Sequence, residues 1–208
     1  MLKTIIEDFQ NELEEKLKAR EEGISTCRKV ITLSKQAIMA IHRDEIDKAR
    51  EKVIEAQKML REVENITSAH QDLVLGIVKV AYQEYAEAQI LLRLVELREF
   101  PAPHELEVPI IPYLLGLADS IGEFRRRALE ALRKRKMGVA EHCLQIMDEI
   151  YSELVALESA YLLAPELRRK CDVARRLIEI TVGDITTQTG RVALEKSIRE
   201  LEKRMQSS

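Results

Sequence analysis

Apolar side chains recur every three or four residues along most of the chain, which is the spacing of one face of an α-helix. The pattern predicts a first helix over residues 2–43, a second over 44–64 and a third over 69–99. Asp44 and Ser68 are the expected N-caps of the second and third helices. Gly23 is expected to break or kink the first.

Residues 100–104 (FPAPH) form the clearest loop, because two prolines stand close together there. A fourth helix is predicted to begin between Pro109 and Pro112 and to run through Lys136, since proline suits a first helical turn. Gly138 should then separate it from a fifth helix that ends near residue 164.

Pro165 should open a last helical region, in which Gly183 and Gly190 are expected interruptions. The chain shows no strand alternation and no internal repeat. The pattern therefore predicts an all-α fold, a bundle of six to seven long helices in a single domain spanning residues 1–208.

Composition agrees with this fold and limits the partners. Hydrophobic residues make up 46% of the 208 positions and charged residues 33%, whereas Gly and Pro occur only seven and five times. Few helix breakers favour helices over sheet. The net charge is only −3, so any affinity for nucleic acid must come from how the charges are distributed.

The cysteines and the apolar stretches indicate a cellular location. Cys27, Cys143 and Cys171 are odd in number, far apart and not in metal-ligand spacing, as expected of reduced thiols in an intracellular protein. Residues 1–8 contain no apolar signal region, and the longest apolar stretch, 108–118, is too short to span a bilayer. We therefore expect a cytoplasmic protein that does not bind membranes.

Two pairs of acids stand in otherwise apolar helical segments. Glu84 and Glu87 are three positions apart, and Asp119 and Glu123 are four apart, so each pair shares a helix face. Neither residues 80–92 nor residues 108–124 contain Lys or Arg. If the two helices pack together, the missing positive charge must come from outside them, and carboxylate oxygens suit a hard cation such as Mg²⁺ or Mn²⁺.

The alternative is that these acids belong to solvated helix faces. A chain with 36 acidic residues forms such pairs by chance, and the pattern alone leaves the metal site and the solvated face equally open. A di-iron carboxylate site in a helical bundle would use Glu-x-x-His motifs, which this sequence does not contain.

Basic residues cluster directly after the second acid pair. Arg125, Arg126 and Arg127 begin a basic stretch that extends to residue 136, and residues 168–176 hold a second cluster. Either cluster could contact phosphates, with solvated helical surface as the alternative. A base-stacking platform is not expected, because the chain has no Trp and only three Phe.

Several segments resemble the translin family, and in particular translin-associated factor X. Residues 83–88 (QEYAEA) are similar to a QEYVEA element of that protein, and residues 113–123 (YLLGLADSIGE) are similar to its YLLGVADLTGE element. The first predicted helix ends in a similar His-Arg, and residues 167–172 (LRRKCD) resemble a family LRKRYD region. The resemblance covers nearly the whole chain.

This resemblance implies a seven-helix subunit of a hollow octamer in which a Mg²⁺-dependent (or Mn²⁺-dependent) endoribonuclease cuts single-stranded RNA. The family's metal-binding and catalytic acids match Glu84, Glu87, Asp119 and Glu123. Residues 125–127 are the nearest candidates for holding the RNA backbone.

The chain departs from the eukaryotic pattern at two places. The loop over residues 100–108 is shorter, which suggests a compact prokaryotic version, here taken as archaeal, and Cys171 replaces a Tyr.

Two other functions stay open. One is a catalytically silent scaffold of the same fold that binds single-stranded RNA or DNA, as translin itself does. The other is a helical interaction module with no nucleic-acid role. Mg²⁺-dependent cleavage separates the nuclease from the scaffold, and salt-sensitive RNA binding separates the scaffold from the module.

Overall fold

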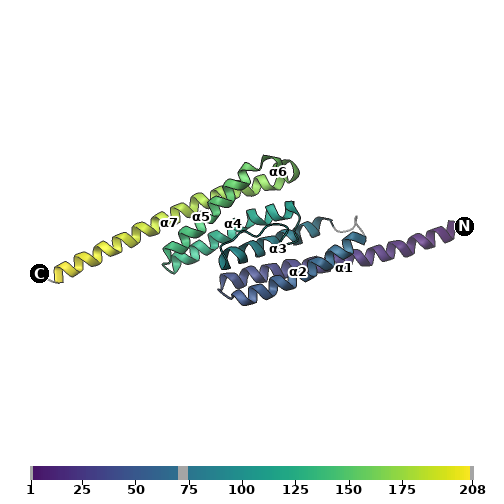
Figure 1. Ribbon diagram of the computed structural model, residues 1–208, viewed down its shortest axis with the longest axis horizontal. Coiled ribbons are helices and arrows are strands. Elements are labelled where there is room, and N and C mark those ends of the chain that lie inside the picture. The colour runs from purple at the N-terminus through teal and green to yellow at the C-terminus, as the bar shows by residue number, and fades with distance from the viewer. Residues whose placement is uncertain (1, 70–74, 207–208) are drawn as a thin grey trace. The chain divides into compact units, whose positions relative to one another are not determined.

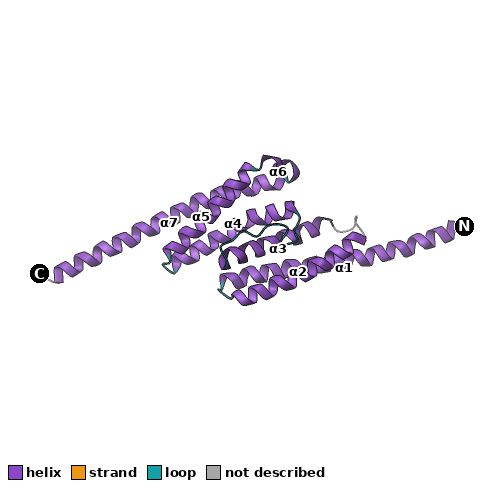
Figure 2. Ribbon diagram, in the orientation of Figure 1, coloured by secondary structure: helices purple, strands orange, loops and turns teal. Residues whose placement is uncertain are grey.

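The computed structural model describes residues 2–69 and 75–206, and these residues form helices joined by short loops (Figure 1). Figure 2 shows no strand in this described part. Its helices are α1 (Leu2–His42), α2 (Ile46–Ala69), α3 (Leu75–Glu96), α4 (Ile110–Arg133), α5 (Met137–Ala156), α6 (Glu158–Leu163) and α7 (Pro165–Gln206). The predicted all-α class is confirmed.

The helices belong to two compact units, residues 1–117 and 118–208, and the boundary falls inside α4. In the first unit, α1 packs on α2 and α3, and α2 packs on α3. In the second unit, α5 and α6 both pack on α7. That the whole chain forms one domain stays a prediction.

Each unit has its own apolar core. Ile41 of α1 and Tyr85 and Leu91 of α3 are fully buried in the first unit. Met147 of α5 and Leu167 of α7 are fully buried in the second. Burial of one such side chain stabilises the folded state by roughly 1.5–3 kcal/mol, so the amphipathic pattern of the sequence is what holds each unit together.

Two tight turns end α1 and α4 in the same way. After α1, Asp44 has φ 60°, the Asp44 N–H donates to the Ile41 carbonyl, and the Glu45 N–H donates to the Ala40 carbonyl. After α4, Arg135 has φ 58° and begins an equivalent turn. This is the Schellman arrangement that usually has glycine at the left-handed position. The prediction of Asp44 as an N-cap is therefore wrong, since it terminates the preceding helix.

Several predicted helix limits are also wrong. Gly23, Gly183 and Gly190 all lie inside unbroken helices, because one glycine costs a helix only about 1 kcal/mol and packing readily outweighs that cost. Ser68 lies within α2 instead of capping the next helix. The predicted fifth helix is divided between α5 and α6, whereas Pro165 opens α7 as predicted. The predicted start of the third helix falls partly on residues 70–74, outside the described residues.

Candidate carboxylate site and nucleic-acid interface

The first acid pair lies on α3, in the first unit. Glu84 and Glu87 are half-buried, whereas Tyr85, Ala86 and Ala88 beside them are fully buried. The fully buried neighbours fix the rotation of α3 in its unit, so the two glutamates share the face that stays accessible to water.

Lys35 of α1 supplies a positive charge to this pair. Its Nζ lies 3.4 Å from Oε1 of Glu84, and the lysine side chain is 60% exposed. The structure thus places a positive charge from α1 beside Glu84, on a residue that sequence reasoning missed. No pattern in the sequence signals this contact, because it depends on which helices pack together.

Gly116 of α4 makes the closest backbone approach to the first pair. A Cβ atom added at Gly116 would lie 2.6 Å from the Gln83 carbonyl oxygen and 2.9 Å from the Glu87 amide nitrogen. Real Cβ atoms essentially never come closer than 3.0 Å to another heavy atom, and both neighbours here are backbone atoms. Only glycine lets the start of α4 pack this tightly on α3.

The second acid pair follows on the same helix, in the second unit. Asp119 and Glu123 are three and seven positions after Gly116 in an unbroken α4, so they lie on the same helix face as that glycine. Both side chains are half-buried. The pair thus lies further along α4, on the helix face that also carries Gly116.

Lys170 of α7 is the partner of this second pair. Its Nζ donates a hydrogen bond to Oδ1 of Asp119 at 2.5 Å, and about a quarter of each side chain is exposed. Arg126 lies 3.9 Å from Glu123. Sequence reasoning placed Lys170 in a phosphate-binding cluster and did not predict its contact with an acid, because that contact joins residues far apart in the chain.

The two acid pairs suit a hard cation by donor type, since all four side chains offer carboxylate oxygens. Among residues 2–69 and 75–206, however, no group of three or more His, Cys, Asp or Glu side chains is placed to hold a metal ion. Lys35 and Lys170 already neutralise one carboxylate of each pair, and a divalent ion would have to compete with them. Metal binding by the four acids stays a prediction.

The three arginines predicted to hold RNA have different surroundings. Arg125 is only 18% exposed, and it donates to Thr181 Oγ1 at 2.6 Å and contacts Asp184 at 3.1 Å. Arg126 is 61% exposed. Arg127 is half-buried and, like Arg125, already interacts with another group of the protein. Arg126 is therefore the best placed of the three to meet a phosphate.

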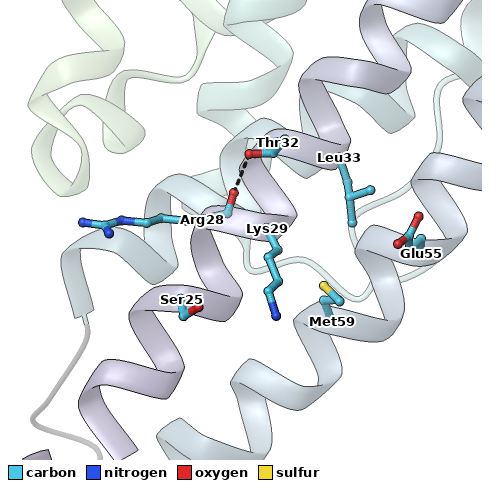
Figure 3. A pocket seen from close by; sticks show the side chains of 7 residues that line it. All are labelled: Ser25, Arg28, Lys29, Thr32, Leu33, Glu55 and Met59. Atoms are coloured by element: carbon cyan, nitrogen blue, oxygen red, sulfur yellow. Dashed lines mark hydrogen bonds between the residues drawn. The ribbon is translucent and has the colours of Figure 1, made fainter.

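A groove of about 380 Å³ lies between α1 and α2, in the first unit. It is lined by Ser25, Arg28, Lys29, Thr32, Leu33, Glu55 and Met59. Figure 3 shows Lys29 extending from α1 towards Met59 of α2, while Arg28 points to the other side. Both basic side chains are exposed, so this groove adds a basic surface that the sequence pattern did not indicate.

Buried tyrosines and cysteines near these elements serve packing. Burial raises the pKa of Tyr85 to about 12, and its hydroxyl accepts a hydrogen bond from Gln89 at 2.7 Å. Burial also raises the pKa of Cys27 and of Cys143 to about 11. All three cysteines are free and buried, so the prediction of reduced thiols is confirmed and a thiolate nucleophile is not favoured.

Comparison with known proteins identifies similar chains. The model of the translin family matches residues 18–179. An uncharacterized protein of Methanocaldococcus jannaschii is 28% identical over 194 residues, which are 92% of this chain and 86% of that protein. Among the described residues, no helix is both long enough and apolar enough to cross a membrane.

Several solved structures are also similar to this chain. The crystal structure of AfC3PO and a structure of AfC3PO with duplex RNA are each 30% identical to this chain, with a TM-score of 0.82 over 89% of it and 97% of theirs. Apo-NeC3PO has a TM-score of 0.82 at 23% identity, covering 88% of this chain and 96% of its own, and it supports the fold alone.

Proposed function

Because this chain belongs to the translin family, we propose that it binds RNA as a homo-oligomer and cleaves single-stranded RNA with Mg²⁺ or Mn²⁺. The similarity to AfC3PO, which has been solved with duplex RNA, supports RNA as the ligand. Single-stranded DNA is a second candidate ligand. Eight copies of the 23.9 kDa chain, the number that the resemblance to translin-associated factor X implies, would have a mass of about 190 kDa.

The observation that carries the proposal is the packing of Gly116. Its contact with the backbone of Gln83 and Glu87 supports a close approach of α4 to the first acid pair. The helix then continues unbroken to the second pair on the same face. The resemblance to translin-associated factor X implies the further step, that Glu84, Glu87, Asp119 and Glu123 serve as one set of metal ligands.

In this mechanism the four carboxylates would hold the metal, in place of their present contacts with Lys35 and Lys170. The bound metal would activate a water molecule and stabilise negative charge on the phosphate and on the leaving oxygen. Arg126, which is largely exposed, would hold a phosphate of the RNA backbone beside Glu123. Once displaced, the ammonium groups of Lys35 and Lys170 would add positive charge for the same backbone.

Cleavage of labelled RNA tests the proposal. The purified chain should cut single-stranded RNA with Mg²⁺ and not with a chelator. Asp119→Asn and Glu87→Gln, which keep side-chain size, should each abolish cleavage and leave RNA binding near that of the wild type. Glu62→Gln and Asp148→Asn are matched controls, because both acids are exposed and lie outside the two pairs. Full activity in either test variant would remove that residue from the site.

The second candidate function is a silent RNA-binding scaffold, and the contact between Lys170 and Asp119 favours it. An acid that receives a 2.5 Å hydrogen bond from an ammonium group already has a stable partner without any metal. In that case the chain would bind RNA in a salt-sensitive way and cleave nothing. The same assay decides between the two functions, with duplex RNA of the same sequence as a further substrate.

A further inference from the structure

The two longest helices each extend beyond the helices that pack on them (Figure 1). α1 has 41 residues and its partner α2 has 24, while α7 has 42 and its partner α5 has 20. At 1.5 Å per residue, these differences are roughly 25 Å and roughly 33 Å of helix. Residues 2–22 of α1 and 186–206 of α7, called here the N-terminal and C-terminal overhangs, contain no buried residue.

The N-terminal overhang has an apolar stripe along one side. The stripe contains Leu2, Ile6, Phe9, Leu13 and Leu17, spaced four, three, four and four positions apart. Phe9 and Leu13 are 55% and 64% exposed. The first four of these residues have the alternating spacing of a coiled-coil seam.

The C-terminal overhang has a stripe of the same kind. Leu194, Ile198, Leu201 and Met205 are spaced four, three and four positions apart, and all of them are exposed. By helical rotation this stripe lies on the side of α7 opposite the face that Ile185 and the other buried residues turn inward. α7 therefore has a second apolar face that its own unit does not use.

Something must cover these two stripes. Arg135 contacts Glu195 of the C-terminal overhang at 2.8 Å, but no apolar residue of either overhang is buried. A helical segment of about 20 residues with so little tertiary packing is only marginally stable in water, and contiguous exposed apolar surface marks an interaction site. Both overhangs are continuous helix, and each offers one half of a coiled-coil contact. The charges beside the stripes indicate which partner each one takes.

The two overhangs are oppositely charged. The N-terminal overhang has seven acidic and four basic side chains, a net charge of −3. The C-terminal overhang has three acidic and five basic side chains, a net charge of +2. Pairing of like overhangs would bring like charges together, whereas pairing of unlike overhangs brings opposite charges beside the seam.

We propose that the N-terminal overhang of one copy binds the C-terminal overhang of a second copy as a coiled-coil pair. The two surfaces differ, so the contact is heterologous, and each copy offers one surface of each kind. Such contacts link copies head to tail. A series of linked copies forms a closed ring when the rotation between neighbouring copies permits it. The proposal rests on the homo-oligomer proposed above, but it is independent of the nuclease activity, since neither overhang includes an acid of the two pairs.

Mixing of two full-length variants tests the proposal. The N variant carries Phe9→Asp and Leu13→Asp, and the C variant carries Leu194→Asp and Leu201→Asp. Light scattering should show that each variant alone has a lower mass than the wild type. An equimolar mixture should gain mass over either variant alone, because it holds one intact surface of each kind. Ile54→Asp, at an exposed apolar residue outside both stripes, is the control and should keep the wild-type mass.

Three results would overturn the proposal. A monomeric wild type at micromolar concentration excludes the contact, and so do variants that keep the full wild-type mass. A mixture that gains no mass, although both variants melt at the temperature of the control, indicates pairing of like overhangs instead. The melting temperatures separate a lost contact from a failure to fold.

Charge reversal gives an independent measurement. Glu12→Lys with Glu15→Lys should weaken association, and so should Lys196→Glu with Arg199→Glu. A chain that carries all four changes should associate again, since the opposite charges are restored with their places exchanged. Association of the wild type should also weaken as salt is raised. If the fourfold variant associates more weakly than both double variants, the charges of the two overhangs do not lie opposite each other in the contact.

Discussion

The acid pair of α3 and the acid pair of α4 have the same kind of partner, a lysine from another helix, but in different settings. Lys35 is largely exposed and lies 3.4 Å from Glu84, whereas Lys170 is half-buried and donates a 2.5 Å hydrogen bond to Asp119. Water screens the first contact, and the second is a charge-assisted hydrogen bond. The α3 pair is positioned by close backbone packing at Gly116, and the α4 pair by this side-chain bond.

The largest effect should come from the backbone contact that positions the α3 pair. In Gly116→Ala, the new Cβ would meet backbone atoms of Gln83 and Glu87, which cannot move aside independently of α3. We expect a loss of about 1–3 kcal/mol in the free energy of unfolding, as for other overpacked sites, measured by urea denaturation.

Gly183→Ala is the matched control, because nothing lies within 4 Å of a Cβ at that position inside α7. It should stabilise the chain by about 0.5–1 kcal/mol through helix propensity alone. Equal effects of the two changes would show that α4 does not pack closely on α3 at Gly116.

This close contact also shows what the sequence could predict and what it could not. The 3.6-residue pattern predicts the helices, and glutamates at positions 84 and 87 must share a face in any helix. The role of Gly116 and the contacts of Lys35 and Lys170 depend on which helices pack together, and a single sequence does not contain that information. Gly183 and Gly116 look alike in the sequence, although only one of them is needed for packing.

The wrong helix limits have a similar cause. Asp44 is a good N-cap by residue type, but the turn after α1 needs a left-handed residue, and Asp accepts that conformation more readily than most residues. The apolar stripe at the start of α1 was expected only to mark a helix. The stripe is exposed because α2 is shorter than α1 and does not reach it.

The next effect in size should come from Lys170. Lys170→Met removes the ammonium group from the half-buried Asp119 carboxylate and should lower the free energy of unfolding in chelator by about 1–2 kcal/mol. If the acids bind metal, Mg²⁺ should raise the melting temperature of this variant more than that of the wild type, because the lysine no longer competes. An equal shift in both proteins would mean that Asp119 is not a metal ligand.

Lys35→Met should have a smaller effect, and this difference tests the comparison directly. The lysine is 60% exposed, so the contact with Glu84 should contribute no more than about 0.5 kcal/mol. Its contribution should also disappear at high salt, whereas that of Lys170 should largely persist. Urea denaturation of both variants at low and high salt is the measurement. A Lys35 variant as unstable as the Lys170 variant would contradict the assignment of the two contacts.

The smallest effect should come from a third acid of α4, Glu130, whose partners lie on the helix surface. Hydrogen bonds from Arg133 and Lys134 lower the pKa of its carboxyl from 4.5 to about 2. A lowered folded-state pKa means that the stabilisation is fully present above pH 4.5 and is lost as the pH falls towards 2. Glu130→Gln should therefore differ slightly from the wild type in melting temperature at pH 7, and this difference should vanish near pH 2.

An NMR titration of the Glu130 carboxyl should give the lowered pKa, and Mg²⁺ should leave it unchanged, because this acid lies outside both pairs. A midpoint near 4.5 would show that the surface network on α4 does not form in solution.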